Sequence, residues 1–354
     1  MNAAAARPLW VRLMIAFIIV LALLLGVLLG FYFWASSGRL DAEELLQHRR
    51  YKEAAPEAPK QFTVLSYNIG YLSGMNNNQA VGFDGELFVE NLRSAVELLR
   101  LTDAQLLGIQ EIDLNSARSG HVDQVDTLAG ALDIAEASVA VNWDKRYVPF
   151  PYWPPSVHFG SMLSGQAVLS DFGIDSSERW VLQEVESEPF YYRAFYLDRI
   201  AQLVELQTQA GPLLVINVHL EAFDRETREK QAQALLERVR RERERPLLVM
   251  GDFNCVPPNA ELQSAFPDEP ETDFEGERSV SLFFEEGWLG EVLADSPHSE
   301  AQAHTFPADE VNRRLDYIFY HRDYFELVDA KTLSVARTPS DHLPVVATLR
   351  WKKD

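Results

Sequence analysis

Polar side chains stand where apolar runs of this chain end abruptly. The clearest case is residues 247–254, LLVMGDFN, in which an apolar, strand-like run breaks into Gly251, Asp252, Phe253 and Asn254. Asp252 and Asn254 are two positions apart, so their side chains would face the same way on a continuing strand. Carboxylate and amide groups at the end of a buried strand suit metal-assisted chemistry, although a single GDFN is equally typical of a polar turn.

Five other segments place polar residues beside an apolar run in the same manner. In chain order, the full set is Asn68, Glu111, His219, Asp252, Asn254, Asp316, Asp341 and His342. The carboxylate and amide oxygens are the hard donors that Mg²⁺ prefers, and the histidines and aspartates can move protons. A set of this composition predicts metal-assisted attack of water on a phosphoester.

The motifs around these residues resemble the endonuclease/exonuclease/phosphatase superfamily, which includes deoxyribonucleases, abasic-site endonucleases, inositol polyphosphate phosphatases and neutral sphingomyelinases. The resemblance covers residues 61–351 and rests on SYN, QE, NVHL, GDFN, RLDYIF and SDHLPV in that order. It implies an α/β fold, a four-layer α/β/β/α sandwich with two packed mixed sheets, whose strand ends converge on a cleft. Several predicted strands follow one another without a helix, which agrees with mixed sheets rather than a doubly wound parallel sheet.

The resemblance implies a metal centre and a set of phosphoryl donors. It makes Glu111 the principal ligand of Mg²⁺ or Mn²⁺, with Asn68 and Asp341 as further predicted ligands. His219 and Asn254 are expected to donate hydrogen bonds to a phosphoryl oxygen as negative charge grows on it.

Proton transfer is expected to involve Asp252 and His342, and the sequence leaves open which of them takes the proton from the attacking water. Asp316 is expected to bond one ring nitrogen of His342, which fixes its tautomer and raises its basicity. The alternative for Asp316 is an ion pair with Arg313 or Arg314. The predicted catalytic residues are therefore His219, Asp252, Asn254, Asp316, Asp341 and His342.

Residues 13–34 form an apolar stretch of bilayer length with no charged side chain. A helix rises about 1.5 Å per residue, so this stretch is long enough for a hydrocarbon core of about 30 Å. Trp10, Tyr32 and Trp34 fit interface positions. We expect an uncleaved single-pass anchor, and small residues at positions 35–37 leave a cleaved signal peptide as the alternative.

The expected organisation has four parts. They are a short tail (1–12), a transmembrane anchor (13–34), a juxtamembrane helix over residues 41–51 with a linker (35–60 in all), and the catalytic domain (61–354). Basic residues flank the span on both sides, so the positive-inside count does not fix its orientation. The short tail favours a catalytic domain on the non-cytoplasmic side.

Composition narrows the substrate class. The chain has 354 residues, 47% hydrophobic and 24% charged, which predicts a folded protein rather than a disordered one. Its single cysteine, Cys255, excludes an internal disulfide and a thiolate-clustered metal site. Its net charge of −21 disfavours a nucleic-acid partner, because nucleases bind phosphates through basic tracks.

Membrane attachment then favours a phospholipid or lipid-linked phosphodiester, with sphingomyelinase-like hydrolysis as the specific expectation. A surface or secreted endonuclease acting on DNA or RNA is the alternative, and a non-catalytic binding module of the same fold comes third. Aromatic residues in segment 142–159 are expected to form either an apolar recognition surface near the cleft or a loop packed on its own sheet: Tyr147, Phe150, Tyr152, Trp153 and Phe159. The sequence does not determine the physiological substrate, the preference for mono- or diesters, or the oligomeric state.

Overall fold

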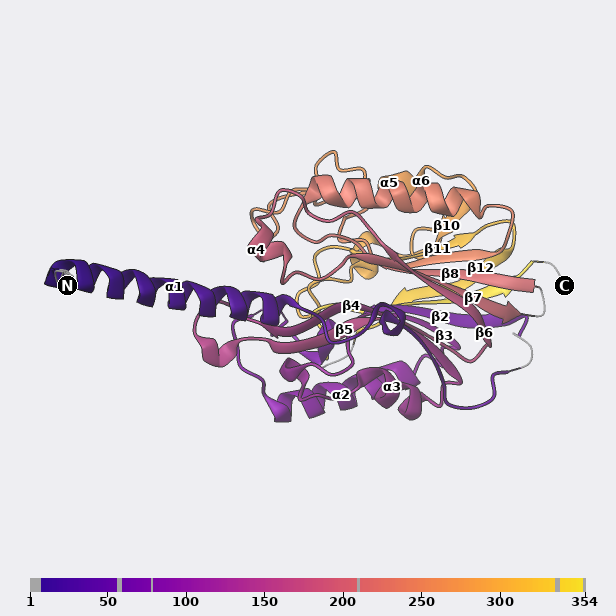
Figure 1. Ribbon diagram of the computed structural model, residues 1–354. Coiled ribbons are helices and arrows are strands. Elements are labelled where there is room, and N and C mark those ends of the chain that lie inside the picture. Colours follow the sequence, from indigo (N-terminus) through magenta and orange to yellow (C-terminus); the bar gives the residue numbers. More distant parts are fainter. Residues whose placement is uncertain (1–7, 56–58, 78, 209–210, 335–337, 353–354) are drawn as a thin grey trace.

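The computed structural model describes residues 8–55, 59–77, 79–208, 211–334 and 338–352. They form two packed β-sheets with helices on both outer faces (Figure 1). The first sheet contains β1 (Leu46–Arg50), β2 (Gln61–Asn68), β3 (Leu106–Asp113), β4 (Glu136–Val148), β5 (Gly160–Ser170), β12 (Phe325–Thr332) and β13 (Val345–Trp351). The second contains β6 (Ile174–Val181), β7 (Ile200–Thr208), β8 (Gly211–His219), β9 (Leu247–Asp252), β10 (Leu289–Glu291) and β11 (Asp316–His321).

Three apolar layers hold the sandwich together. The strand orders are β1-β4-β5-β3-β2-β13-β12 and β10-β11-β9-β8-β7-β6. Buried side chains such as Phe62, Val204 and Met250 fill the space between the sheets. Helices α2 (Gly85–Arg100) and α3 (Gln124–Leu132) cover the first sheet, and α5 (Arg225–Arg241) and α6 (Ser281–Phe284) cover the second (Figure 1). The predicted four-layer α/β/β/α sandwich with two mixed sheets is thereby confirmed.

Two parallel strand pairs bring the predicted site residues to one end of the sandwich. Strands β2 and β3 are parallel, as are β8 and β9, so the carboxyl ends within each pair coincide. The β8–β9 register sets His219 directly opposite Asp252, and the antiparallel β9–β11 register sets Asp316 opposite Asp252. Backbone pairing therefore gathers side chains that lie far apart in the sequence.

The segment that follows the apolar N-terminal helix differs from the expected helix over residues 41–51. It forms a 3₁₀ turn, η1 (Ala42–Leu45), and then strand β1, which pairs antiparallel with β4. The buried Glu136 accepts hydrogen bonds from Arg50 at 2.8 Å and His48 at 3.0 Å. Pairing with a distant edge strand thus overrides the local helical pattern. Of the predicted linker, residues 56–58 lie outside the described residues.

Because β1 belongs to the sheet, two truncated chains that both lack the N-terminal helix should differ in stability. A chain that starts at Gly38 keeps the β1–β4 ladder, whereas one that starts at Gln61 loses it along with the ion pair between Arg49 and Asp123. Each backbone hydrogen bond contributes about 0.5–1.5 kcal/mol net. We expect the chain from Gln61 to melt several degrees lower in calorimetry, and equal melting temperatures would show that β1 is dispensable.

Helix α1 (Leu9–Ser36) projects away from the sandwich as a single long helix (Figure 1). It is long and apolar enough to cross a membrane, with a mean hydropathy of 3.1 and none of its most apolar window buried. A signal sequence near the N-terminus would satisfy the same criteria. The end of the sandwich from which α1 leaves is the end where β4 turns into β5.

Candidate active site

The buried carboxylate of Asp252 lies at the centre of the converging polar residues. Its Oδ2 accepts a hydrogen bond from Asn68 Nδ2 at 3.0 Å, and its Oδ1 accepts the backbone N–H of Asn254 at 2.8 Å. The Nε2 atoms of His219 and His342 lie 3.5 and 3.7 Å from Asp252 Oδ2. Two histidines, one at the end of β8 and one in the segment before β13, thus face one carboxylate oxygen.

A glycine makes this arrangement possible at the end of β9. Gly251 has φ 141°, and a Cβ added there would lie 1.9 Å from the carbonyl oxygen of Val218 on β8. No other residue permits this approach of β9 to β8. Gly251 therefore meets a direct steric requirement at the end of β9.

Glu111 is turned toward the site by an irregularity in β3. The β3–β5 register shifts between Ile109 and Ile112, and Glu111 adopts φ 51° within this bulge. A β-bulge re-aims a side chain that would otherwise alternate across the sheet. Glu111 Oε1 consequently lies 3.7 Å from His219 Nε2.

Asn77 joins Glu111 to Asp341, and sequence reasoning missed it. Its Nδ2 donates to Glu111 Oε2 at 2.9 Å and to Asp341 Oδ2 at 3.1 Å. Asn77 lies in the loop after the 3₁₀ turn η2 (Gly70–Leu72), away from any strand end. No apolar run precedes it, so the pattern that reveals the other polar residues gives no signal here.

Asp316 and His342 form a buried pair. The ring Nδ1 of His342 lies 2.9 Å from Asp316 Oδ2, as the sequence interpretation expected. Arg313 instead pairs with Asp268, and Arg314 pairs with Glu291, so neither arginine forms the alternative ion pair with Asp316. The second carboxylate oxygen, Asp316 Oδ1, is buried and has no hydrogen-bond partner among the described residues.

The surroundings give the two histidines opposite protonation states. Burial alone would lower the pKa of His342, but the carboxylates of Asp316 and Asp252 outweigh it and raise that pKa to about 10. Burial lowers the pKa of His219 well below its ordinary value, with further lowering by the charges of Arg199 and His342. At neutral pH, His342 is therefore an imidazolium and His219 is neutral.

Two carboxyl groups of the same cluster have a pKa raised toward neutrality. Burial raises the pKa of Asp252 to about 7, and the charge of Asp316 adds to this against the opposing effect of His342. Burial and the neighbouring Glu111 charge raise the pKa of Asp341 to about 6. Such values suit groups that exchange protons during catalysis.

Arg199 is a second residue that the sequence interpretation missed. Its side chain is buried, and its Nε donates to Glu221 Oε2 at 3.2 Å while its Nη2 donates to Tyr196 at 3.0 Å. Its Nη1 finds no partner in the part of the chain that the structure describes. The Arg199 charge acts on both Glu111 and His219, so a fixed cation stands beside the candidate site. Its position just before β7 follows no motif that the sequence displays.

The structure shows which groups the two predicted site asparagines, Asn254 and Asn68, bond. Strand β9 ends at Asp252, and Asn254 has φ 50°, so the continuing strand on which the expected shared orientation of Asp252 and Asn254 rested is not formed. Asn254 Nδ2 donates to the carbonyl of Leu220 at 3.0 Å. Asn68 Oδ1 accepts the N–H of Gly70 at 3.1 Å while its Nδ2 holds Asp252. Their catalytic and metal-binding roles stay predictions.

Two groups of side chains fit a divalent cation. Glu111 and Asp341 both direct carboxylate oxygens at the Nδ2 of Asn77, so a hydrogen-bond donor lies between two like charges where a cation would be attracted. Within the described residues, Asp252, Asp316 and His342 also offer ligand atoms that lie within 4.8 Å of one another. Hard oxygen donors match Mg²⁺ and Mn²⁺.

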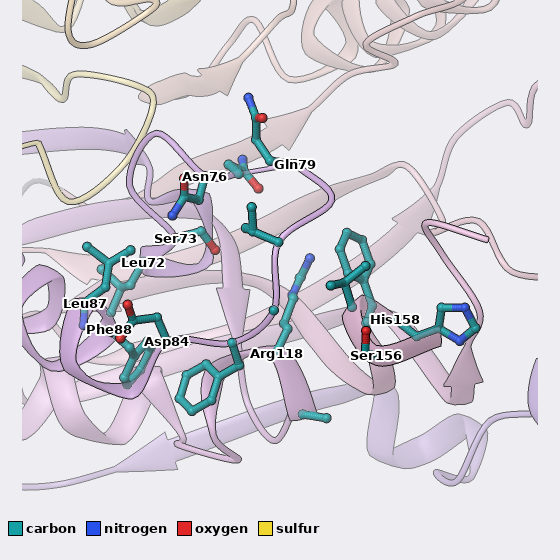
Figure 2. A pocket seen from close by; sticks show the side chains of 17 residues that line it. Leu72, Ser73, Asn76, Gln79, Asp84, Leu87, Phe88, Arg118, Ser156 and His158 are labelled. Carbon is teal, nitrogen blue, oxygen red and sulfur yellow. Dashed lines mark hydrogen bonds between the residues drawn. The ribbon is translucent and has the colours of Figure 1, made fainter. Parts of the chain in front are cut away.

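A pocket of about 180 Å³ adjoins the site through Asn77, which lines it. Figure 2 shows Ser73 and Asn76 on one side of this pocket, Ser156 and His158 on the other, and Arg118 between them. The guanidinium of Arg118 lies 3.2 Å from the ring centroid of Tyr71 and pairs with the buried Asp113. Of the aromatic residues expected near the cleft, Phe159 lines the pocket, whereas Tyr152 and Trp153 are exposed.

Comparison with solved structures shows the same fold in several proteins. An endonuclease/exonuclease/phosphatase from Beutenbergia cavernae aligns with a TM-score of 0.61 at 19% identity, over 83% of this chain and 72% of that one. A mannosyl-6-phosphatase from Bacteroides thetaiotaomicron aligns with a TM-score of 0.56 at 20% identity, over 81% and 99%. The human Nocturnin catalytic domain, solved with a bound sulfate anion, aligns with a TM-score of 0.56 at 18% identity, over 88% and 99%.

The sequence itself carries the family relationship. Among curated proteins, no sequence matches the chain significantly. The family model described as the Endonuclease/Exonuclease/phosphatase family matches residues 65–342, a span that contains every member of the predicted polar set. Members of this family are hydrolases that act on phosphoesters. On this match, the chain belongs to the endonuclease/exonuclease/phosphatase family.

Proposed function

We propose that this protein is a membrane-anchored, divalent-metal-dependent phosphodiesterase that acts on a lipid or lipid-linked phosphoester. The observation that carries the proposal is the convergence of His219, Asp252 and His342 beside the carboxyl end of β3. That strand end pairs with the start of β5, at the end of the sandwich from which the apolar helix α1 leaves. A phosphoester in a lipid headgroup would then lie near both the catalytic groups and the anchor.

Asp252 is the proposed base. Its pKa of about 7 lets it be ionised in part at neutral pH and accept a proton from the attacking water. His342 is already protonated, because its pKa is about 10, and so cannot take that proton. Its imidazolium instead donates to the phosphoryl group or the leaving oxygen, and the neutral His219 supplies a second donor.

The proposed metal ligands are Glu111 and Asp341. Asn68, which the sequence also predicts as a ligand, would add a neutral amide oxygen. A bound Mg²⁺ or Mn²⁺ would withdraw charge from a phosphoryl oxygen and stabilise the leaving oxygen. The like charges of Glu111 and Asp341 support this assignment, because they raise the pKa of Asp341 and a cation would relieve that repulsion.

Membrane anchoring is proposed from α1, with the catalytic domain on the non-cytoplasmic side. Alkaline washing should leave the full chain in the membrane pellet and release a chain that starts at Gly38. Mature protein from the native host that begins near Ser36 would instead establish a cleaved signal peptide. Protease added to intact cells should digest the domain if the proposed orientation is correct.

A substrate panel tests the proposed activity. The full chain in detergent, supplied with Mg²⁺, would be assayed against sphingomyelin, glycerophospholipids, inositol phosphates, DNA, RNA and a soluble nitrophenyl phosphodiester. Cleavage of a phospholipid headgroup would support the proposal. Cleavage of DNA or RNA with no turnover of any lipid would replace it with the nuclease alternative.

The His342–Asp316 pair should control the alkaline limb of the activity profile. In Asp316→Asn, His342 loses the carboxylate that contributes most to raising its pKa, so its proton should dissociate at lower pH. We expect kcat/KM of the variant to decline at a lower pH than that of the parent, with a smaller loss at pH 6.

The same pair makes a prediction about stability. The folded pKa of His342 lies above its ordinary value of 6.5, so its stabilising contribution is complete below about pH 6.5 and disappears as pH rises through 10. The difference in unfolding free energy between parent and Asp316→Asn should therefore shrink from pH 6.5 to pH 10. An unchanged alkaline limb and a pH-independent difference would show that Asp316 does not act through His342.

A further inference from the structure

Large aromatic side chains are exposed on three loops at the end of the sandwich from which α1 leaves. They occupy the β4–β5 loop, the region of α4 (Phe190–Arg193) and the turn before α5 (Figure 1). Their exposed fractions are high enough to need an explanation in a protein that faces water. They are Trp153 at 80%, Phe223 at 76%, Phe190 at 68%, Tyr152 at 62% and Tyr191 at 55%, together called the aromatic collar.

The collar is continuous with the last turns of α1. The ring of Tyr32 lies 6.2 Å from that of Phe190 and 5.8 Å from that of Phe195. The ring of Phe31 lies 5.9 Å from that of Tyr147, in the strand that leads into the β4–β5 loop. Two of the three regions, the one around α4 and the strand that leads into the β4–β5 loop, therefore lie at the level of the helix end.

Polar contacts fix the helix end to the domain. Arg146 donates its backbone N–H to the Ser37 carbonyl at 3.0 Å, and Leu40 donates its N–H to Asp144 Oδ2 at 2.8 Å. Ala35 is fully buried. Helix α1 and the catalytic domain are thus joined without a free linker, and the depth of α1 in a bilayer sets the height of the domain above it.

The length of α1 places the collar in the interfacial layer. Its 28 residues extend about 42 Å at 1.5 Å each, which exceeds the hydrocarbon core of about 30 Å. Its last turns, with Tyr32 and Trp34, then lie at the membrane–water interface, where aromatic side chains are favoured. Phe190 contacts Tyr32, so it lies at the same depth.

Charge identifies the kind of contact. The chain carries a net charge of −21, so attraction to anionic headgroups does not explain this surface. Two basic side chains beside the helix end are already engaged, since Arg39 pairs with Asp144 and Arg146 bonds Ser37. Insertion of aromatic rings requires no anionic lipid and is insensitive to salt.

The loop that carries Tyr152 and Trp153 also forms one wall of the pocket beside the candidate active site. Its following residues, Ser156 to Phe159, line the pocket together with Asn77. Figure 2 shows Ser156 and His158 on that wall. The exposed rings of Tyr152 and Trp153 therefore lie a few residues along the chain from the pocket that adjoins the candidate active site.

We propose that the aromatic collar inserts into the interfacial layer of the bilayer that α1 spans and holds the pocket mouth against the lipid headgroups. The substrate phosphate would then enter from the plane of the membrane rather than from solution. This inference rests on the proposed anchor and lipid substrate, but the position of the collar can be measured without any catalytic assay.

The depth of Trp153 tests the collar directly. The single native cysteine, Cys255, is buried, so Trp153→Cys in the full chain offers one accessible thiol for an environment-sensitive fluorophore. Glu326→Cys is the matched control, because Glu326 is an exposed residue near the start of β12 and is not part of the collar. In phosphatidylcholine vesicles, nitroxide-labelled lipids should quench the dye at position 153 and not at 326. Equal quenching by a water-soluble quencher at both positions would overturn the proposal.

Activity gives a second and separable test. Tyr152→Ser combined with Trp153→Ser should lower turnover of vesicle-embedded sphingomyelin about tenfold or more, because less apolar surface enters the interface. Turnover of the soluble nitrophenyl phosphodiester should stay within about twofold, as for surface substitutions in general. Leu101→Ser, which changes an equally exposed side chain at the far end of α2, should alter neither.

The outcomes distinguish the collar from the proposed function. Equal losses on both substrates, or no loss on vesicles despite lipid turnover by the parent, would overturn the collar. If the parent hydrolyses only the soluble ester, the proposal of a lipid substrate is wrong. The depth measurement at position 153 then decides by itself whether the collar enters the bilayer. Lipid-accessible dye at position 153 would support it in that case as well.

Discussion

Replacing His219 with alanine or Asp252 with asparagine should lower turnover of the accepted phosphoester by on the order of 10² to 10³, the usual effect of removing one preorganised group. Both side chains are buried at strand ends and face each other at 3.5 Å. His219 is the proposed neutral donor to the phosphoryl oxygen, and Asp252 the proposed base. Initial rates on the soluble nitrophenyl phosphodiester would measure the effect.

The same substitutions should leave the fold intact. Folding raises the pKa of Asp252 to about 7, so keeping its carboxylate ionised above that pH costs stability that the neutral amide of asparagine does not. At pH 8 we therefore expect the melting temperature of Asp252→Asn to lie within a few degrees of the parent's. His48→Gln, which changes a partly exposed histidine on β1, is the matched control and should keep full activity.

Either of two results would contradict this assignment. If the folded His219 and Asp252 variants turn over substrate at nearly the parent rate, the two side chains have structural roles only. If both variants unfold, their buried hydrogen bonds matter chiefly for the fold. A loss of activity in His48→Gln would indicate that the assay reports stability rather than chemistry.

Removing divalent metal should abolish turnover, and Mg²⁺ or Mn²⁺ should restore it. The reason is the pair of carboxylates, Glu111 and Asp341, that faces a single amide nitrogen. Two like charges this close disfavour full ionisation unless a cation joins them. Dialysis against a chelator followed by metal titration would measure the effect, and elemental analysis would confirm that the metal has been removed.

Two substitutions locate the metal. Glu111→Gln should weaken Mn²⁺ binding, measured by electron paramagnetic resonance, because the amide offers a poorer ligand than the carboxylate. Asp316→Asn should leave that affinity nearly unchanged if the metal lies at Glu111 and Asp341, since Asp316 is bonded to His342. The reverse result would place the metal in the Asp252, Asp316 and His342 cluster. Full activity of metal-free protein would refute the metal mechanism altogether.

The polar residues at strand ends were accessible to sequence reasoning because their signal is local. An apolar run that breaks into Asp252 or His219 is visible in a few residues, and the order of several such breaks identifies the family. The apolar helix at the N-terminus is equally visible, because a bilayer-length run without charge needs no partner to be recognised.

Contacts between distant segments could not be found in the same way. The segment after the apolar helix forms β1 because the edge of β4 is free to pair with it, and a helix was expected only from its local pattern. Asn77 and Arg199 reach the site from a loop and from the start of a strand, where no periodicity marks them. Asn254 leaves the strand direction because β9 ends at Asp252.

The sequence by itself determined the family, the four-layer sandwich, the apolar helix and most residues of the candidate site, since each depends on local pattern and on motif order. Only the tertiary structure decided how those residues are charged. A pKa depends on burial and on neighbours from distant strands, and these give His342 a pKa of about 10 and keep His219 neutral. The choice between Asp252 and His342 as the proposed base therefore follows from packing, which no run of consecutive residues records.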